Sequence, residues 1–419
     1  QAYNEYLKIS DIYWNTKYQK YAAENAIALA KDMVSSDTTQ NSLIAGAKED
    51  SSHDNKTTVL STISYERGQL TVNEKKLARA YDNYIKIYPH EPETAVILSN
   101  AGALYYNNNQ FPEALKYFNT ILKHFDTSPE ADYAQYMAME SYFGKHDFAS
   151  AEIVARRLKN KPDLDPALLT KAKERLAASI YLSAEVFADS ANHLAAGDEY
   201  IRVIKEVPDA EFADLSLFNA ALEYDKAKEY RRAIETYNYL IETRSNSKYL
   251  LDAMNNLAID YGELGEFKNA AITYERLHAT AKDSINQYDA LYNASIFFVK
   301  AEEWEDAIRI NRKFVQKYPE SGDADDLFFD IATYYLKLND LENANQLYGE
   351  YVNKFPNSPR VVETYFHRGE YFRKNNEITK AIAEYQKSVQ KNEEFKRNDQ
   401  PGNDFYAAEA LFNMTMIKY

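Results

Sequence analysis

Eight alanines recur along this chain at a nearly constant spacing. Their separations are 37, 45, 37, 37, 37, 37 and 37 residues. These reference alanines are Ala114, Ala151, Ala196, Ala233, Ala270, Ala307, Ala344 and Ala381. A fixed period of this length is typical of a repeat array, in which each unit packs on its neighbours to complete a shared core. The period therefore predicts one continuous solenoid rather than the separate compact domains that a chain of 419 residues would otherwise suggest.

Other positions repeat in register with the reference alanines. An aromatic residue stands nine residues before every one of them, and an aromatic residue usually stands four residues after, with Ala155 and Asn311 as departures. Twelve residues before the alanine the side chain is small, with Met139 as the exception. Small side chains allow two helices to approach closely. Each unit therefore predicts a pair of amphipathic helices, such as 250–263 and 268–281, joined by a short turn at Gly265.

These repeated positions, or columns, resemble the pattern of the tetratricopeptide repeat (TPR) family. In the first unit the residues that carry the resemblance are Leu98, Gly102, Tyr105, Phe111, Ala114 and Phe118. The repeat is longer than the usual 34 residues, and its loops carry a Pro-x-Ser signature at Pro319 and Pro356. That signature is similar to the longer repeats of bacterial envelope proteins, such as the Tol-Pal coordinator, outer-membrane assembly lipoproteins and gliding-motility proteins. The resemblance implies an all-α solenoid, a role in protein–protein interaction and a periplasmic or envelope location.

The array predicts three segments. Residues 1–90 read as degenerate N-terminal helical units, interrupted at about 35–58 by a polar stretch that we expect to be a mobile loop. Residues 91–404 hold eight hairpins, the third of which follows an eight-residue insertion and begins with a long helix at 167–189. Residues 405–419 repeat the start of a unit and are expected to form the first helix of a further, truncated hairpin.

Composition narrows the class of partner. The chain has 64 acidic and 49 basic residues, a formal charge of -15, which argues against a nucleic-acid ligand. No stretch approaches the roughly 18 apolar residues of a membrane span, so we expect none in this segment. The sequence also begins without a charged and apolar leader. We expect that a signal peptide or lipid anchor was removed or never present.

The sequence offers no motif for catalysis. Cysteine is absent, and the seven histidines show no metal-binding spacing. There is no glycine-rich phosphate loop and no nucleophile elbow. We therefore predict that the chain is not an enzyme, and we predict neither a cofactor nor a metal.

The family resemblance implies that the first helix of every hairpin lines the concave face. Fifteen residues before the reference alanines lies a mostly aromatic ladder, and one residue further on asparagine recurs, including Asn100. Aromatic and amide side chains suit an adaptable binding face. The ladder contains no lysine, which argues against the carboxylate clamp of chaperone-binding relatives. The partner-binding residues that we predict on these ladders are Tyr136, Tyr181, Phe218, Asn219, Asn255, Asn256, Tyr292, Asn293, Phe329 and Phe366.

Eighteen residues before the alanines lies an acidic column. Its members predicted to face a partner are Asp252, Asp289, Asp326 and Glu363. These carboxylates would steer a basic segment of a partner into the groove. Alternatively, they offset the macrodipole in the first turn of a helix, as lysines in the last turns would do at the other end. The rings and amides have a structural alternative too, because they could pack on the next hairpin and bond local groups.

Together these features predict a non-enzymatic scaffold of a bacterial cell envelope that binds a protein or peptide partner on its concave face. Two alternatives remain at this point. The segment could be the helical superstructure of a larger envelope enzyme acting on the cell wall. It could also be a structural solenoid that associates with itself through the half-repeat at 405–419.

Overall fold

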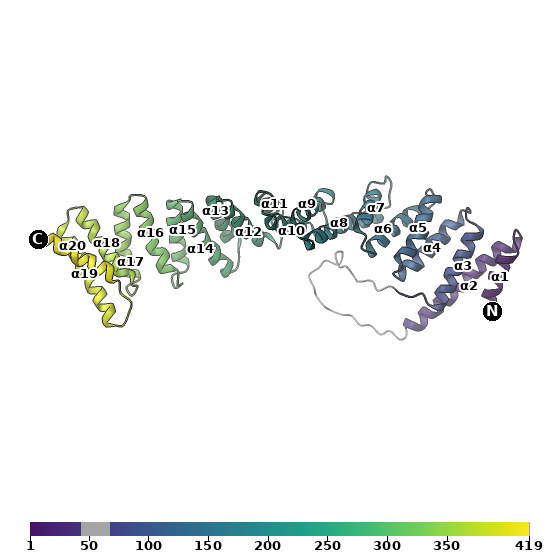
Figure 1. Cartoon of the computed structure of the whole chain (residues 1–419), viewed down its shortest axis with the longest axis horizontal. Helices are drawn as coiled ribbons and strands as arrows, with labels where there is room; N and C mark the ends of the chain where they lie inside the picture. The colour runs from purple at the N-terminus through teal and green to yellow at the C-terminus, as the bar shows by residue number, and fades with distance from the viewer. Residues whose placement is uncertain (43–67, 419) are drawn as a thin grey trace. The chain divides into compact units, whose positions relative to one another are not determined.

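The computed structural model describes residues 1–42 and 68–418, which form helices α1 to α20 with no strand among them (Figure 1). The predicted all-α repeat architecture is confirmed. Helix α2 runs to Ser42, so it includes the first residues of the segment at 35–58 for which we expected a loop. The remainder of that segment lies outside the described residues. The helices group into two compact units, Gln1–Glu229 and Tyr230–Tyr419.

The first unit holds ten helices within the described residues. They are α1 (Ala2–Ile12), α2 (Lys17–Ser42), α3 (Val72–Ile87), α4 (Glu93–Asn107), α5 (Phe111–His124), α6 (Ala131–Gly144), α7 (Phe148–Lys159), α8 (Pro166–Asp189), α9 (His193–Glu206) and α10 (Ala213–Lys226). Helices α1 to α3 pack around Leu77, Tyr81 and Tyr84, and the Tyr3 hydroxyl donates to the carbonyl of Lys76 at 2.7 Å. The long α8 begins where the sequence predicted it, since the Asp165 carboxylate caps its first amides.

The second unit continues the same alternation. Its helices are α11 (Tyr230–Thr243), α12 (Leu250–Glu263), α13 (Phe267–Thr280), α14 (Ser284–Lys300), α15 (Trp304–Lys317), α16 (Ala324–Lys337), α17 (Leu341–Lys354), α18 (Arg360–Lys374), α19 (Ile378–Arg397) and α20 (Asp404–Lys418). Pairs such as α12 with α13 and α18 with α19 lie side by side (Figure 1). Helix α20 packs on both α18 and α19.

In the first and eighth hairpins a glycine on the first helix faces a ring on the second helix. A Cβ added to Gly102 would lie 2.6 Å from the ring of Phe118, and one added to Gly369 would lie 2.5 Å from the ring of Tyr385. Glycine is therefore required at these contacts, because any side chain would overlap the ring.

Two hairpins depart from the repeated columns, and in each of them the residues at the small position and the ring position match one another. Met139 occupies the small position in the second hairpin and Ala155 the ring position, and both are fully buried. In the sixth hairpin Ser295 donates a hydrogen bond to the Asn311 amide oxygen, and Asn311 donates to the Leu327 carbonyl at 2.9 Å. A bulky and a small residue have thus exchanged places in one hairpin. A buried polar pair replaces the ring contact in the other.

The turns between paired helices repeat one backbone conformation. Five residues before every reference alanine the residue has a positive φ, from 55° at Asn109 to 74° at Gly265. The amide of the following residue donates to the carbonyl of the aromatic residue nine before the alanine, at 2.8–3.0 Å in all eight repeats. This is the left-handed cap that ends a helix and satisfies its last carbonyls. Such positions favour glycine or asparagine.

Two turns should therefore be stabilised by glycine. Ala191 and Glu302 hold positive φ values of 58° and 56° on exposed turns. Because a Cβ is disfavoured in this conformation, we expect Ala191→Gly and Glu302→Gly each to raise the free energy of unfolding by about 0.5–1 kcal/mol. Urea unfolding followed by circular dichroism measures the change. The reverse substitution Gly265→Ala should cost a similar amount, and a loss of stability in the first two variants would contradict this account.

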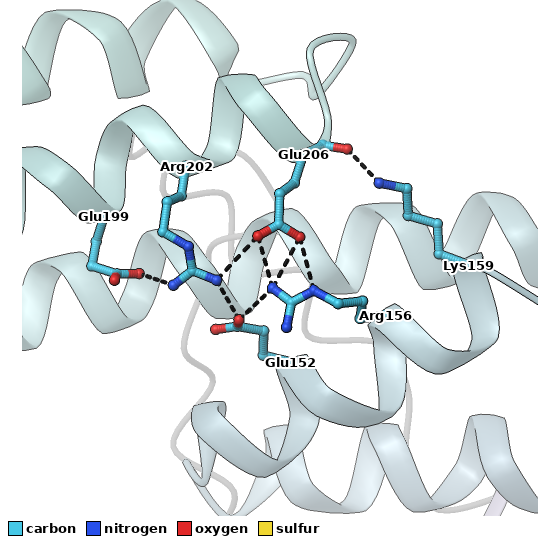
Figure 2. Close-up of polar contacts among 6 residues, drawn as sticks. All are labelled: Glu152, Arg156, Lys159, Glu199, Arg202 and Glu206. Carbon is cyan, nitrogen blue, oxygen red and sulfur yellow. Dashed lines mark hydrogen bonds and ion pairs between the residues drawn. The ribbon is translucent and has the colours of Figure 1, made fainter.

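An ion-pair network joins the second helices on either side of α8 (Figure 2). On α7 the Arg156 guanidinium donates to both Glu206 carboxylate oxygens and to Glu152 at 2.6 Å, and Lys159 bonds the Glu206 carbonyl at 2.6 Å. On α9 the Arg202 guanidinium contacts Glu152, Glu199 and Glu206. Burial opposes ionisation of Glu206, yet the bonds from the two arginines hold its pKa below the ordinary value.

Candidate functional site

The predicted binding residues all lie on the first helices of hairpins, but they are not equally accessible. Tyr181 and Phe329 are buried, at 4% and 5% exposure, so these two rings belong to the core. The three predicted aspartates, Asp252, Asp289 and Asp326, are exposed. The remaining predicted residues are half-buried, namely Tyr136, Phe218, Asn219, Asn255, Asn256, Tyr292, Asn293, Glu363 and Phe366.

One pocket of the second unit collects five of the predicted residues. It has a volume of about 320 Å³ and lies between the consecutive first helices α12 and α14, with the second helix α13 also contributing to its lining. The predicted residues that line it are Asp252, Asn255, Asp289, Tyr292 and Asn293. Three positions of the sequence ladders thus converge on the same cavity from two neighbouring repeats.

The acidic column is not uniform. Asp252 lies in the first turn of α12, as do Asp326 in α16 and Glu363 in α18. Helix α14 begins at Ser284, so Asp289 lies beyond its first turn. The helix macrodipole can therefore explain why acids stand at the other three positions. It cannot explain Asp289, because the effect of the macrodipole falls off within the first turn.

The acids also differ in their partners. Asp326 pairs with Arg360 at 2.8 Å, and Glu363 lies 3.4 Å from the ring nitrogen of His367. Among the described residues, neither Asp252 nor Asp289 has an ion-pair partner. The two carboxylates that line the pocket are thus the ones left open by the fold.

The asparagines behave in two ways as well. The Asn219 amide donates to the Tyr181 hydroxyl at 2.8 Å, and the Asn256 amide donates to the Tyr237 hydroxyl at 3.2 Å. These two amides therefore bond local groups, which was the structural alternative for them. Asn293 occupies the same repeat position as Asn256. Within the described part of the chain it makes no hydrogen bond and lines the pocket.

The lining of the pocket includes Tyr274, the counterpart of Tyr237. Tyr274 follows its reference alanine by the same four residues, is only 4% exposed and stacks on Phe297 with ring centroids 5.6 Å apart. Its hydroxyl has no hydrogen-bond partner among residues 1–42 and 68–418. Burial raises the pKa of Tyr274. Tyr237 and Asn256 are thus hydrogen-bonded to each other, whereas the equivalent Tyr274 and Asn293 of the next repeat are not.

We expect the two tyrosine hydroxyls to contribute differently to stability, and the two Tyr→Phe variants serve as controls for each other. Tyr237→Phe removes a buried hydroxyl that accepts a bond from Asn256, so we expect a loss of about 1–2 kcal/mol in the free energy of unfolding. Tyr274→Phe removes a hydroxyl that has no hydrogen-bond partner in the described part of the chain, so it should change the free energy of unfolding by less than about 0.5 kcal/mol. Urea unfolding of the two variants measures both values. Equal losses would show that the Tyr274 hydroxyl also contributes to folding.

The other predicted residues of the second unit form a separate cluster. The Arg360 guanidinium lies 4.7 Å from the centre of the Phe329 ring while it pairs with Asp326. Phe366 contacts Tyr406 with ring centroids 5.3 Å apart. In this cluster the predicted residues therefore already contact Arg360 or another aromatic ring. In the first unit, Lys171 lies 5.2 Å from the Tyr136 ring centre.

Sequence reasoning missed part of the pocket. Tyr274 and Leu277 come from the second helix α13, and Asn286 from the first turns of α14. The ring of Tyr274 was visible as a member of the aromatic column, but a column cannot show that a hydroxyl lacks its usual partner. Arg360 was also missed, because nothing in the repeat pattern marks it as the counter-ion of Asp326.

No helix among the described residues is long and apolar enough to cross a membrane. The same residues contain no group of three or more histidine, aspartate or glutamate side chains that could hold a metal ion.

Comparison with known proteins identifies the repeat type. One tetratricopeptide-repeat family model matches residues 100–166 and 329–394, and a second one matches residues 289–321. No curated protein sequence gives a significant match.

Several solved structures resemble the chain. A tetratricopeptide repeat protein from Parabacteroides merdae is 14% identical, with 69% of this chain and 100% of that one covered and a TM-score of 0.27. YrrB, described as a TPR protein with an unusual peptide-binding site, is 16% identical over 46% and 91% of the two chains, with a TM-score of 0.29. The TPR2AB domain of yeast Sti1, in a pHSP90 complex, is 15% identical over 58% and 99%, with a TM-score of 0.25. These scores are too low to carry an argument about function.

The segments that the family models match fall on the repeated hairpins. The small position at Gly102 and the reference alanines Ala114 and Ala151 fall inside the first matched segment, and Ala344 and Ala381 inside the last. The matched segments of the chain are therefore tetratricopeptide repeats.

Proposed function

We propose that the chain is a non-enzymatic protein-interaction scaffold that holds an extended segment of a partner protein against the first helices of the second unit. The observation that carries this proposal is the pocket between α12 and α14, where Asn255, Tyr292 and Asn293 come together from two repeats. An amide side chain both donates and accepts, so it can bond the backbone of a bound peptide. A half-buried ring beside it supplies apolar contact area.

A cross-linking pull-down tests this proposal. The wild-type chain is compared with a variant carrying Asp289→Lys, Tyr292→Ala and Asn293→Ala, three residues that are exposed or half-buried and line the pocket. Phe329 is left intact, since a change to this buried ring would disturb the core. The matched control carries Arg312→Ala and Gln316→Ala, two exposed residues of α15.

We expect a partner that is captured by the wild type and the control but lost with the pocket variant. Circular dichroism melting confirms that all three proteins are folded. Equal capture by the three proteins would remove the pocket as the binding site.

We further propose a bacterial cell-envelope location for this scaffold. The feature that supports it is the longer repeat with its Pro-x-Ser loops, at Pro319 and Ser321 and again at Pro356 and Ser358. Fractionation of the native cells, with an antibody against this chain, tests the location. Recovery in the cytoplasmic fraction would contradict it.

Self-association is a second candidate function, and α20 favours it. Phe405, Leu411, Phe412 and Met416 of this helix are between 49% and 65% exposed. The position of Leu411 corresponds to Leu217 and Leu291 in other first helices, which are buried. An apolar stripe that other repeats cover is thus open here, and a second copy could cover it. Light scattering measures the mass, and a dimer that is lost with Phe412→Asp would support this function. A monomeric wild type would exclude it.

A further inference from the structure

We infer that the pocket between α12 and α14 is a seat for one cationic side chain, a lysine or arginine of the bound peptide, held between the carboxylates of Asp252 and Asp289. The inference rests on the proposed function, because it names the chemistry of the segment that the scaffold binds. It also assigns different roles to the members of the acidic column.

The first line of evidence is the selective absence of internal counter-ions. Asp326 and Glu363 have Arg360 and His367 beside them, at 2.8 Å and 3.4 Å. In the described part of the molecule Asp252 and Asp289 have no such neighbour, and both line the pocket. A cation that sits between two exposed carboxylates of adjacent repeats would be attracted by both of them.

The second line of evidence is independent of charge. Tyr274 lines the pocket and is more than nine-tenths buried, and its hydroxyl has no hydrogen-bond partner among the described residues. Asn293 faces the same pocket, also without a hydrogen bond. In the preceding repeat the equivalent Tyr237 and Asn256 bond each other at 3.2 Å. A tyrosine buried to this extent usually has a partner for its hydroxyl, so Tyr274 and the half-buried Asn293 offer a ligand two polar groups that bond nothing else among the described residues.

These two observations define the ligand. The cavity of about 320 Å³ is at the lower end of the size of small-ligand sites, which suits a single long side chain with its adjoining backbone. The two carboxylates would bind the ammonium or guanidinium head, and the Tyr274 hydroxyl and Asn293 amide would bond the peptide group beside it. An acidic or wholly apolar segment could not satisfy the carboxylates.

Selection from a phage-displayed library of short random peptides on the full chain tests the inference. Selected peptides are made synthetically, and their affinities for wild type and variants are measured by fluorescence anisotropy. We expect every tight binder to contain a lysine or arginine. Its replacement by alanine should weaken binding about tenfold or more. Asp252→Asn or Asp289→Asn should weaken binding by about tenfold, and Tyr274→Phe by about fivefold.

Asp326→Asn is the matched control, because it makes the same change in the same column at an acid that already has a partner. It should leave affinity within about twofold. Added salt should weaken the wild-type complex and have little effect on the complex of the Asp252→Asn, Asp289→Asn double variant.

The outcomes separate the inference from the proposed function. Peptides that need no basic residue but lose binding with Tyr292→Ala would leave the groove as a peptide site and overturn the cation seat. Equal losses for Asp326→Asn and Asp289→Asn would also overturn it, because the effect would then be one of general charge. If no peptide is selected, or if binding survives every substitution in the pocket, both the inference and the peptide-binding function fail.

Discussion

Phe118→Ala is expected to lower the free energy of unfolding by about 3–5 kcal/mol, the cost of removing a large ring from a closed core. Phe118 has no exposed surface, and its ring lies against Gly102 of the paired helix. Because glycine has no side chain, Gly102 itself cannot fill the space that the ring leaves. Urea unfolding followed by circular dichroism measures the loss.

A second substitution tests the reason for that loss. The second hairpin carries Met139 and Ala155 at the two positions that Gly102 and Phe118 occupy in the first. The double variant Gly102→Met, Phe118→Ala copies this exchange and should recover about 1–3 kcal/mol relative to Phe118→Ala. Gly102→Met alone should destabilise the wild type by about 1–3 kcal/mol, since its Cβ would overlap the ring.

Helix propensity needs its own control, because any residue other than glycine or proline favours a helix more than glycine does. Gly102→Ala in the Phe118→Ala background supplies it. If that variant recovers as much stability as the methionine variant, the gain comes from propensity and the exchange of volumes is not its cause. Strictly additive effects of Gly102→Met and Phe118→Ala would lead to the same conclusion.

Arg202→Met is expected to cost about 1–3 kcal/mol at neutral pH. The guanidinium contacts Glu152, Glu199 and Glu206, whose side chains are between 13% and 22% exposed (Figure 2). Although burial opposes its charge, the neighbouring carboxylates raise the pKa of Arg202 above the ordinary value. Its removal leaves Glu152 and Glu206 with Arg156 alone, and it leaves Glu199 without an ion-pair partner among the described residues. Urea unfolding at pH 7 measures the cost.

The pH dependence of this variant follows from the same charges. In the wild type the pKa of Glu206 is lowered, so its contribution to stability is present above its ordinary pKa of 4.5 and lost as pH falls through the lowered value. Without Arg202 the carboxylates repel and protonate more readily. The gap between variant and wild type should therefore narrow as pH falls from 7 towards about 4.5.

Arg309→Met is the matched control for this experiment. Arg309 also bridges two acids, Glu275 and Asp306, but its side chain is 48% exposed. Solvent screens such a pair, so its loss should cost less than about 1 kcal/mol. An equal cost for the two arginines would show that burial of the network has no special effect.

The repeat unit could be read from the sequence because the same physical demand recurs at every hairpin. A close helix contact needs one small residue, and Ala184, Ala221, Ala258 and Ala332 satisfy it directly. A short turn between paired helices needs a left-handed residue, and Asn109 and Gly265 suit it. Each such demand is local to a few residues, so their types alone predict it.

The matched departures show where this reasoning stops. Met139 and Ala155, or Ser295 and Asn311, each break a column when taken alone. Only the packed hairpin shows that each break is compensated by its partner, since the two positions are sixteen residues apart and share one contact. When each repeat position is considered separately, the sequence cannot predict that two residues share one packing volume or one hydrogen bond.

The same limit applies to the candidate site. The sequence alone determined the repeat, the two helices of each unit and the ladders on the first helix, because all of these follow from residue type and period. It could not determine which ladder members remain open. The tertiary structure buries Phe329, pairs Asp326 with Arg360 and bonds Asn256 to Tyr237, while it leaves Asp289 and Tyr274 in one pocket. The physical reason is that a hydrogen bond or ion pair depends on where two side chains meet in space, and identical residues at equivalent positions need not meet the same neighbours.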